Sequence, residues 1–198
     1  KTVTFPGGSY LTSSTLNIPS STDLMCHSAT LTGNTGATPY FEIRQGAISV
    51  SINGGSFYNI NASAFVKATG TFSTNRRYSR QLRFDGVWLE TAATTVAFDF
   101  SNGVRQAYWS NCYIQANSGF SLVDNIVECS ITNSLIFHSG ASKVGTAGFY
   151  ISTTRPNGEN EGICVTNCHV DFFEKGFIIS DCFIFTISTV TPGNITFP

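Results

Sequence analysis

The clearest feature of the chain is a short pattern of apolar and polar residues that recurs along it. The five copies are INGGSFY at 52–58, FDGVWLE at 84–90, WSNCYIQ at 109–115, ITNSLIF at 131–137 and VTNCHVD at 165–171. The last three share an apolar residue, a hydroxyl residue, Asn, Cys or Ser, and later an Ile or Val. Copies begin 22 to 34 residues apart, and self-similarity at such intervals is typical of stacked repeat architectures.

A second segment recurs between these copies. Its versions are VAFDF at 96–100, GFSLV at 119–123, GFYIS at 148–152 and GFIIS at 176–180. Both segments are short runs rich in Phe, Ile, Val and Thr, bounded by Gly, Asn, Asp and Ser, and no helical periodicity persists over a useful length. The chain is therefore predicted to be essentially all-β.

The repeat also predicts how the strands are arranged. A coil of about 22 residues with two or three short strands cannot bury its own apolar side, so successive coils must stack, as they do in a parallel β-helix. Equivalent side chains then lie one above another at a spacing of about 4.8 Å. Three columns are expected: an amide ladder of Asn111, Asn133 and Asn167 at a bend, small residues Cys112, Ser134 and Cys168 inside it, and an internal aromatic stack of Phe98, Phe120, Phe149 and Phe177.

Length and composition narrow the function classes. The 198 residues are expected to form one domain, 1–198, with one core. Charged residues make up 12% and the net charge is −1, so the chain lacks the basic excess of a nucleic-acid-binding surface, and no nucleic acid partner is expected. No run approaches 18 apolar residues, so no membrane insertion is expected either. The start, KTVTFPGGSY, has neither an initiator Met nor an apolar signal region, which favours a fragment over a processed chain.

The cysteines form no recognisable metal motif. Their positions are Cys26, Cys112, Cys129, Cys164, Cys168 and Cys182, with no CxxC pair, and several fall at equivalent core positions of the repeat. We predict buried free thiols rather than disulfides or metal ligands, and no metal or other cofactor.

The first coil carries a family resemblance. Residues 3–33, VTFPGGSYLTSSTLNIPSSTDLMCHSATLTG, contain an FPGGSY turn, a Leu-x-Ile-Pro-Ser segment at 16–20 and an apolar strand ending at Gly33. They closely resemble the first coil of pectate-lyase-like right-handed β-helix proteins, particularly bacteriophage tailspikes and tail depolymerases, and the later stretch GICVTNCHVDFFEKGFIIS resembles the body of the same superfamily. The resemblance implies a right-handed parallel β-helix, a homotrimer on the tail of the virion, and binding or cleavage of a bacterial surface polysaccharide such as capsule, exopolysaccharide or O-antigen. The paired-Asp and Gly-His-Gly motifs of polygalacturonases and the calcium-binding Asp cluster of pectate lyases are absent, so pectin is not the expected substrate.

The alternation of side chains along a strand predicts one outward surface. This outward surface is expected if Val127, Cys129 and Ile131 face the core together with Ala107 and Trp109. The outward set is then Glu128 and Ser130 in one coil, Gln106 and Tyr108 in the coil before, and Gln81, Arg83 and Asp85 in the coil before that.

Two carboxylates of this surface are predicted to be catalytic, Glu128 and Asp85. Glycoside cleavage generally needs an acid and a base or nucleophile roughly 5–10 Å apart, and two coils separate backbones by about 9.6 Å, which suits an inverting enzyme. Arg83, Tyr108 and Gln106 are predicted to bind substrate beside them. The alternative is that outward polar residues of a β-helix are simply solvated.

A neighbouring outward stripe is unusually apolar. It holds Trp88, Tyr113, Leu135 and His169, with Phe137 beside them. Trp88 and Tyr113 are predicted to stack on sugar rings, and the competing interpretation, which the apolar Leu135 and Phe137 favour, is contact between subunits of a trimer.

A basic cluster lies just before the second copy of the repeat. The stretch NRRYSRQLR at 75–83 places Arg76, Arg77, Arg80 and Arg83 around Tyr78. Guanidinium groups match carboxylates, which would suit an acidic capsule polysaccharide; a solvated loop is the competing interpretation.

Together these features predict a tailspike-type polysaccharide depolymerase, with hydrolysis favoured over lyase chemistry. A lyase would instead use a base at a uronic acid, for which Tyr108 beside Arg83 is the better pair. Two functions without catalysis are also compatible with the sequence: a non-enzymatic receptor-binding fibre and a structural stretch of β-helix shaft. Serine hydrolase, P-loop NTPase and zinc protease functions find no support, because GxSxG, GxxxxGK and HExxH motifs are absent.

Overall fold

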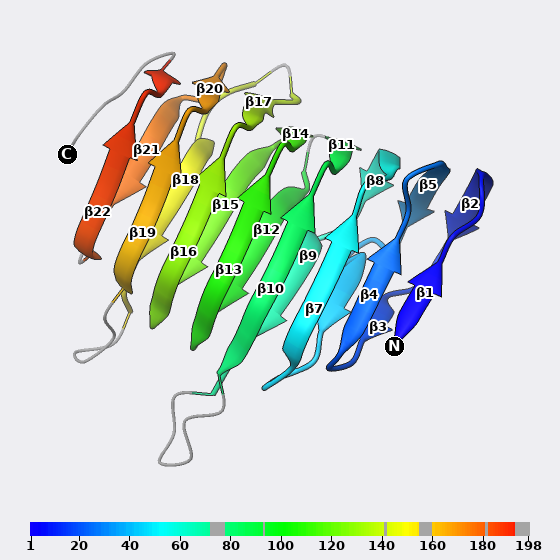
Figure 1. The fold of residues 1–198 in the computed structure, drawn as a ribbon. Helices are drawn as coiled ribbons and strands as arrows, with labels where there is room; N and C mark the ends of the chain where they lie inside the picture. The colour runs from blue at the N-terminus through cyan, green and yellow to red at the C-terminus, as the bar shows by residue number, and fades with distance from the viewer. Residues whose placement is uncertain (72–77, 93, 141, 155–159, 181, 193–198) are drawn as a thin grey trace.

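The structure, a computed structural model, describes residues 1–198 except 72–77, 93, 141, 155–159, 181 and 193–198. The described residues form no helix, and hence none that could cross a membrane. The strands pair in parallel and stack into three sheets that wind around one core as a β-helix of about seven turns (Figure 1). The predicted all-β, parallel β-helix fold is confirmed.

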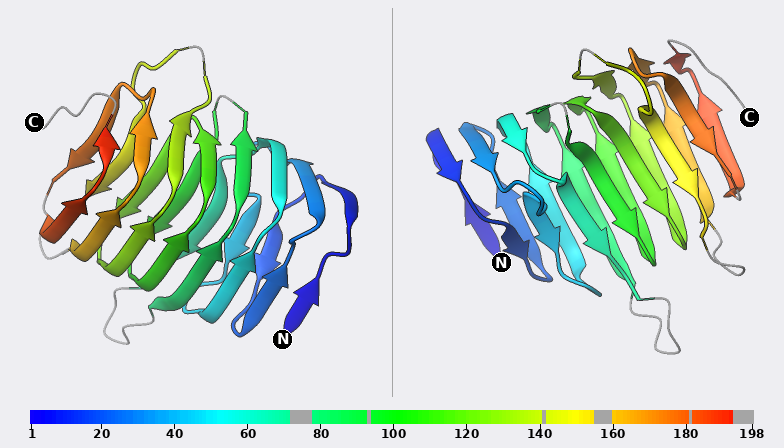
Figure 2. Two further views of the ribbon diagram at one scale, coloured as in Figure 1. Left: turned by 45° about the horizontal axis from the view of Figure 1, so that its top comes forward. Right: turned by 180° about the vertical axis from the view of Figure 1, so that it is seen from behind.

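A coil contributes one strand to each sheet, and successive coils follow one another along the molecule (Figure 2). Sheet A contains β1 (Thr2–Thr4), β4 (Thr22–Met25), β7 (Ile48–Asn53), β10 (Ser79–Asp85), β13 (Val104–Ser110), β16 (Ile126–Thr132), β19 (Asn160–Thr166) and β22 (Cys182–Ser188). Sheet B contains β2 (Gly8–Thr12), β5 (Ala29–Asn34), β8 (Ser56–Asn61), β11 (Trp88–Thr91), β14 (Tyr113–Ala116), β17 (Leu135–His138), β20 (His169–Asp171) and β23 (Thr191–Pro192). Sheet C contains β3 (Leu16–Ile18), β6 (Phe41–Ile43), β9 (Ala64–Thr69), β12 (Val96–Ser101), β15 (Ser118–Val123), β18 (Ala147–Ser152) and β21 (Lys175–Ile179).

Aromatic residues stack through the core from coil to coil. Phe98, Phe120, Phe149 and Phe177 occupy one register position of sheet C, and their successive ring centroids lie 5.1, 4.8 and 4.8 Å apart. All four side chains are buried. Trp109 of sheet A packs against this column, with its ring nearly perpendicular to those of Phe98 and Phe120. The predicted aromatic column is thus confirmed.

The three asparagines predicted to form an amide ladder lie at the corner between sheets A and B, and the bond of such a ladder joins Asn133 and Asn167. Asn111, Asn133 and Asn167 have φ of 55°, 50° and 52°, a left-handed conformation that Asn adopts more readily than most residues. The Asn167 amide donates a hydrogen bond to Oδ1 of Asn133 at 2.7 Å. In the coil before Asn111, the equivalent position is occupied by Gly86, which has no side-chain acceptor. The Asn111 amide instead donates to the carboxylate of Asp85 at 3.0 Å. The small side chains predicted behind the corner, those of Cys112, Ser134 and Cys168, are all buried.

A second left-handed position recurs near the start of the strands of sheet A. Its occupants, with φ between 55° and 65°, are Ser21, Ser49, Gln81, Gln106, Glu128, Gly162 and Ile184. A left-handed residue interrupts the alternation of side chains, so two successive residues face outward before the pattern resumes. In β16 these are Val127 and Glu128, while Ile126 and Cys129 face the core. The prediction that Val127 faces inward is wrong for this reason.

The six cysteines are free, as predicted. Cys26, Cys112, Cys129 and Cys168 are buried, as predicted, whereas Cys164 and Cys182 are only half-buried. Burial raises the pKa of the Cys26 thiol to about 11 and the pKa of the Cys112 and Cys129 thiols to about 12. The core therefore holds these thiols in their neutral form.

The raised pKa of Cys129 predicts a loss of stability in alkali. Because its pKa is higher in the folded state, the thiol contributes stability below about pH 9, and that contribution disappears between about pH 9 and 12 as the unfolded thiol ionises first. Above pH 9 we expect this thiol to lower the free energy of unfolding by about 1.4 kcal/mol per pH unit. Urea titrations at about pH 8.5 and pH 10.5 measure this, and Cys129→Val should lose correspondingly less than the wild type. An equal loss in both proteins would contradict the prediction.

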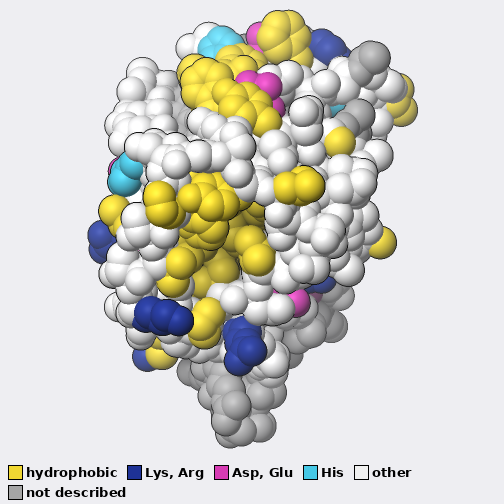
Figure 3. Space-filling view, turned by 90° about the vertical axis from the view of Figure 1, so that its right-hand side faces the viewer, with side chains coloured by type: hydrophobic (Ala, Val, Ile, Leu, Met, Phe, Trp, Pro, Cys, Tyr) yellow, Lys and Arg dark blue, Asp and Glu magenta, His cyan; other side chains and the backbone are white. Residues whose placement is uncertain are grey.

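The apolar core reaches the surface at the N-terminal end of the coil. Seen from this end, hydrophobic side chains gather in the middle of the molecule (Figure 3). Val3, Phe5, Leu16, Ile18, Leu24 and Phe41 line an apolar recess of about 210 Å³ there. This recess lies on a different surface from the outer face of sheet A.

Candidate functional site

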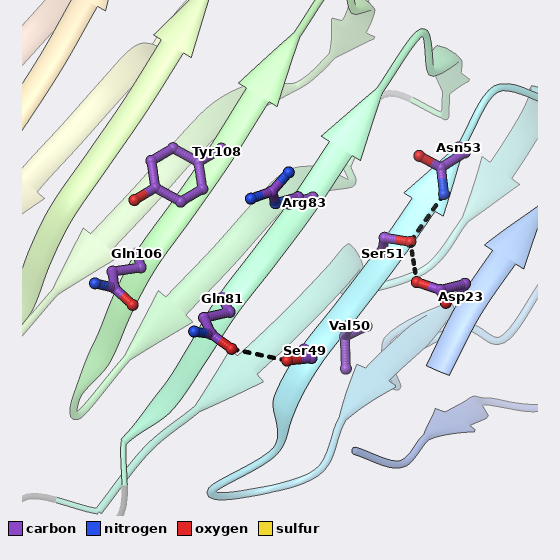
Figure 4. A pocket seen from close by; sticks show the side chains of 9 residues that line it. All are labelled: Asp23, Ser49, Val50, Ser51, Asn53, Gln81, Arg83, Gln106 and Tyr108. Carbon is purple, nitrogen blue, oxygen red and sulfur yellow. Dashed lines mark hydrogen bonds between the residues drawn. The ribbon is translucent and has the colours of Figure 1, made fainter. Parts of the chain in front are cut away.

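A groove of about 650 Å³ crosses the outer face of sheet A (Figure 4). Four neighbouring strands line it: β4 with Asp23, β7 with Ser49, Val50, Ser51 and Asn53, β10 with Gln81 and Arg83, and β13 with Gln106 and Tyr108. A second hollow of about 480 Å³ shares Asn53, Arg83 and Tyr108 with it and adds Phe84, Asp85 and Ser110. The two hollows therefore adjoin, and together they extend towards the corner with sheet B.

The recurrent left-handed position lies beneath this groove. Ser49, Gln81 and Gln106 occupy it in three successive coils, with φ of 56°, 57° and 55°. A residue other than glycine in this conformation costs about 1 kcal/mol or more, and such strained positions cluster at functional sites. The same position recurs in the other coils, so the strain alone does not mark the site; what distinguishes this face is the hollow and its polar lining.

Hydrogen bonds fix several polar side chains of the groove. The Ser51 hydroxyl donates to Oδ1 of Asp23 at 2.7 Å, and the Asn53 amide donates to the Ser51 oxygen at 2.8 Å. The Ser49 hydroxyl donates to Oε1 of Gln81 at 2.8 Å. Figure 4 shows that the Ser51–Asp23 and Ser49–Gln81 bonds link neighbouring strands, whereas the Asn53–Ser51 bond lies within β7. These polar groups are thus held in place by hydrogen bonds within the protein.

The structure brings together three of the residues predicted to bind substrate. Arg83 and Tyr108 are paired in register on β10 and β13, and the guanidinium carbon lies 5.9 Å from the centre of the Tyr108 ring. Gln106 lies beside them in the lining of the same groove. Their role in binding stays a prediction. Of the basic cluster, Arg76 and Arg77 lie outside the described residues.

Asp85 stands at the end of the groove nearest sheet B. Its Oδ1 accepts hydrogen bonds from the Ser110 hydroxyl at 2.5 Å and from the Asn111 amide at 3.0 Å. These two donors belong to the next coil, so they turn the carboxylate towards β13. The arrangement holds Asp85 in one orientation at the rim of the smaller hollow.

Glu128 and Asp85 do not form the carboxylate pair expected from the sequence. Asp85 is in register with Ser110, and Ser110 with Thr132, whereas Glu128 lies four residues before Thr132. Four residues along a strand and two strand spacings separate the two backbones by roughly 16 Å, not about 9.6 Å. Glu128 is exposed but lines neither hollow. The offset along the strand, which counting coils leaves out, is the reason for the difference.

Trp88 and Tyr113 lie on sheet B, around the corner from the groove. Their rings stack with centroids 4.1 Å apart and 16° between planes, and the Tyr113 ring meets Phe137 at 5.7 Å. The Trp88 indole donates to Glu90 at 2.8 Å; burial and then the charge of Glu90 raise the pKa of Tyr113. Because the two rings cover each other, each has at most one face left for a sugar. That this stripe, with the exposed Leu135, contacts other subunits stays a prediction.

The repeat does not single out Asp23, Ser51 or Asn53. For Asn53 the signal exists, because aligning INGGSFY with FDGVWLE places Asn53 beside Asp85 in the next coil. Asp23 lies in STDLMC, which has no Gly or Asn at the corner and so is hard to recognise as a copy. Across the described ranges, no three His, Cys, Asp or Glu side chains lie close enough to hold a metal ion.

No protein-family model matches the chain, and no curated protein matches it in sequence. Among the solved structures, the fold is similar to a crystal structure of "a putative glycosyl hydrolase" from Parabacteroides merdae. The TM-score is 0.36 at 10% identity, over 96% of this chain and 82% of that chain. At this identity the similarity concerns the fold alone. The chain is a parallel β-solenoid, and its chemistry has to be argued from its own groove.

Proposed function

We propose that this chain is the β-helix of a bacteriophage tailspike or tail depolymerase, carried on the virion, and that it binds and cleaves a bacterial surface polysaccharide in the groove of sheet A. The observation that carries the proposal is the lining, in which hydroxyl, amide, carboxylate, guanidinium and phenol groups converge from four strands. A polysaccharide presents many hydroxyl groups, and a mixture of donors and acceptors on rigid strands suits such a ligand. The resemblance of residues 3–33 to the first coil of tailspikes supports the biological setting.

If the reaction is hydrolysis, the proposed catalytic carboxylates are those of Asp23 and Asp85 rather than that of Glu128. Asp23 is in register with Ser51, and Ser51 with Arg83, so Asp85 lies two coils and two residues from Asp23. This places the backbones of the two aspartates roughly 12 Å apart, on either side of Arg83. Inverting hydrolases hold their carboxyl groups about 6.5–9.5 Å apart, with the attacking water between them. Both side chains therefore have to lean towards the bound sugar during the reaction.

β-Elimination is the second candidate, and the proximity of Arg83 and Tyr108 favours it. In this reaction a base removes the proton next to the carboxylate of a uronic acid, the C4–O bond breaks, a C4=C5 double bond forms, and the departing oxygen takes up a proton. Arg83 would neutralise the sugar carboxylate, and the Tyr108 oxygen would move the proton. A uronic acid in the substrate is required for this reaction and not for hydrolysis.

The test is to incubate the whole protein with surface polysaccharides of candidate bacterial hosts, following reducing ends and the ultraviolet absorbance of unsaturated uronic acids. Hydrolysis predicts reducing ends without absorbance and a loss of about 100-fold or more in Asp85→Asn. β-Elimination predicts both signals and a similar loss in Tyr108→Phe. Glu128→Gln is expected to keep the wild-type rate, as is the control Glu42→Gln on the outer face of sheet C.

Other outcomes of this experiment would contradict the proposal in different ways. Binding without either signal would overturn cleavage and identify a receptor-binding fibre. Loss of activity in Glu128→Gln but not in Asp85→Asn would show that the catalytic residues lie outside the groove. Failure to bind any host polysaccharide would overturn the proposal as a whole.

A further inference from the structure

Three arginines line the outer face of β10 and β13. Arg80 and Arg105 are paired in register on these strands, and Arg83 follows three residues after Arg80, in the lining of the groove. All three side chains are exposed. As far as the chain is described, none of them forms an ion pair with Asp or Glu. None of the three guanidinium groups is therefore paired directly with a carboxylate of the described residues.

Aromatic rings, rather than carboxylates, hold two of these side chains. The guanidinium of Arg105 lies over the ring of Tyr78 at 4.2 Å from its centre, and that of Arg83 lies 5.9 Å from the ring of Tyr108. A ring attracts the face of a guanidinium group and leaves the N–H donors at its edge free. The rings thus position the donors without occupying them.

On the described strands, no acceptor side chain flanks the Arg80–Arg105 pair at its own register position. The strand neighbours at the same register position are Ile48 on β7 and Val127 on β16, both apolar. Like charges on directly neighbouring strand positions destabilise a sheet unless something screens them. A bound anion between the two guanidinium groups would remove that cost.

We infer that Arg80, Arg83 and Arg105 form a carboxylate-binding strip, so that the polysaccharide taken by the groove is an acidic one. The inference rests on the proposed function and names its substrate class: a glycan that carries uronic acids or pyruvate ketals. Arg83 binds one carboxylate in the middle of the groove, and Arg80 with Arg105 binds another at the edge. The planar guanidinium group suits a carboxylate because two parallel N–H donors reach its two oxygens.

The negative groups of the site favour widely spaced acids over a polyphosphate. Asp23 and Asp85 flank Arg83 on either side, and the whole chain carries a net charge of −1. A nucleic acid has a phosphate on every nucleotide and would bring some of them against these carboxylates. An acidic polysaccharide can carry one carboxylate per repeating unit and so meet the arginines alone.

The experiment measures binding of the whole protein to an array of bacterial capsular and O-antigen polysaccharides, both acidic and neutral. Each acidic glycan is also presented after chemical reduction of its carboxyl groups to alcohols, and single-stranded DNA is included. We expect capture of carboxylated glycans, at least tenfold weaker binding after carboxyl reduction, and binding about 10–100-fold weaker in Arg83→Gln. Arg80→Gln combined with Arg105→Gln should weaken it as well. Arg44→Gln, an exposed arginine of the turn between β6 and β7, is the matched control.

The outcomes separate this inference from the function on which it rests. If the captured glycans are neutral, or if carboxyl reduction or Arg83→Gln leaves binding unchanged, the acidic substrate class is overturned while polysaccharide binding stands. Binding of single-stranded DNA as tight as that of any glycan would overturn the substrate class too. If no glycan is captured, both proposals fall.

Discussion

Replacing Phe149 with alanine is expected to lower the free energy of unfolding by about 3–5 kcal/mol. Phe149 is fully buried, and its ring lies between those of Phe120 and Phe177, 4.8 Å from each and within 4° of parallel. The substitution removes a fully buried ring and leaves a cavity between two rings that the sheets hold apart. Urea unfolding followed by circular dichroism measures the effect.

A phenylalanine near the C-terminal edge provides the control for Phe149. Phe183 on β22 is 69% exposed, so Phe183→Ala should change the free energy of unfolding by no more than about 0.5 kcal/mol. Phe149→Leu should lie between the two, because leucine refills part of the cavity. A loss for Phe149→Ala as small as that for Phe183→Ala would show that the aromatic column contributes little to the free energy of unfolding.

Gly119→Ala is expected to lower the free energy of unfolding by about 1–3 kcal/mol, although it adds a single methyl group. A Cβ at this position would overlap the backbone carbonyl oxygen of Gly148 in the next coil. A side chain could rotate away, but a carbonyl oxygen of the parallel ladder can move only if the strand moves. The preceding coil has Ala97 at the same register position. Thermal unfolding of the variant measures the cost.

Gly7 offers the comparison for this substitution. A Cβ there would meet the Cβ of Ser28 at 3.5 Å, an ordinary contact, and the residue is exposed. Gly7→Ala should therefore change stability by less than about 0.5 kcal/mol. If Gly119→Ala is as harmless as Gly7→Ala, the strands of sheet C can move enough to accommodate the added methyl group, which would contradict the prediction.

The fold is readable from the sequence because stacking makes neighbouring coils use the same kinds of residue. Asn133 and Asn167 recur at one corner because their amides bond to each other in the left-handed conformation that the corner needs. Phe120 and Phe149 recur because each ring covers the other. Contacts between identical side chains one strand spacing apart leave a repeat in the sequence, and the repeat therefore predicts the sheet.

The second left-handed column leaves no such trace. Its occupants range from Ser49 and Gln81 to Glu128, Gly162 and Ile184, so no single residue type identifies this position in the sequence. The backbone conformation there is imposed by the ladders on both sides and not by the preference of the residue itself. For this reason the alternation of side chains predicts the faces of Cys129 and Ile131 correctly and fails for Val127.

The site is predicted only in part, for a related reason. Arg83, Tyr108 and Gln106 come together as expected, since neighbouring coils at one register position are necessarily close. Glu128 and Asp85 do not, because they differ in position along the strand as well as in coil. Asp23 joins the groove from a coil whose sequence hardly resembles the repeat.

By itself, the sequence determined that this protein is a stack of β-coils with an aromatic core and asparagine corners, because those columns consist of like residues in direct contact. Only the tertiary structure decided which polar side chains share a groove. That depends on the register between strands and on a left-handed residue in each coil, and both are set by hydrogen bonds between backbones that are far apart in the chain. Backbone groups are the same in every residue, so the sequence carries little record of where they pair.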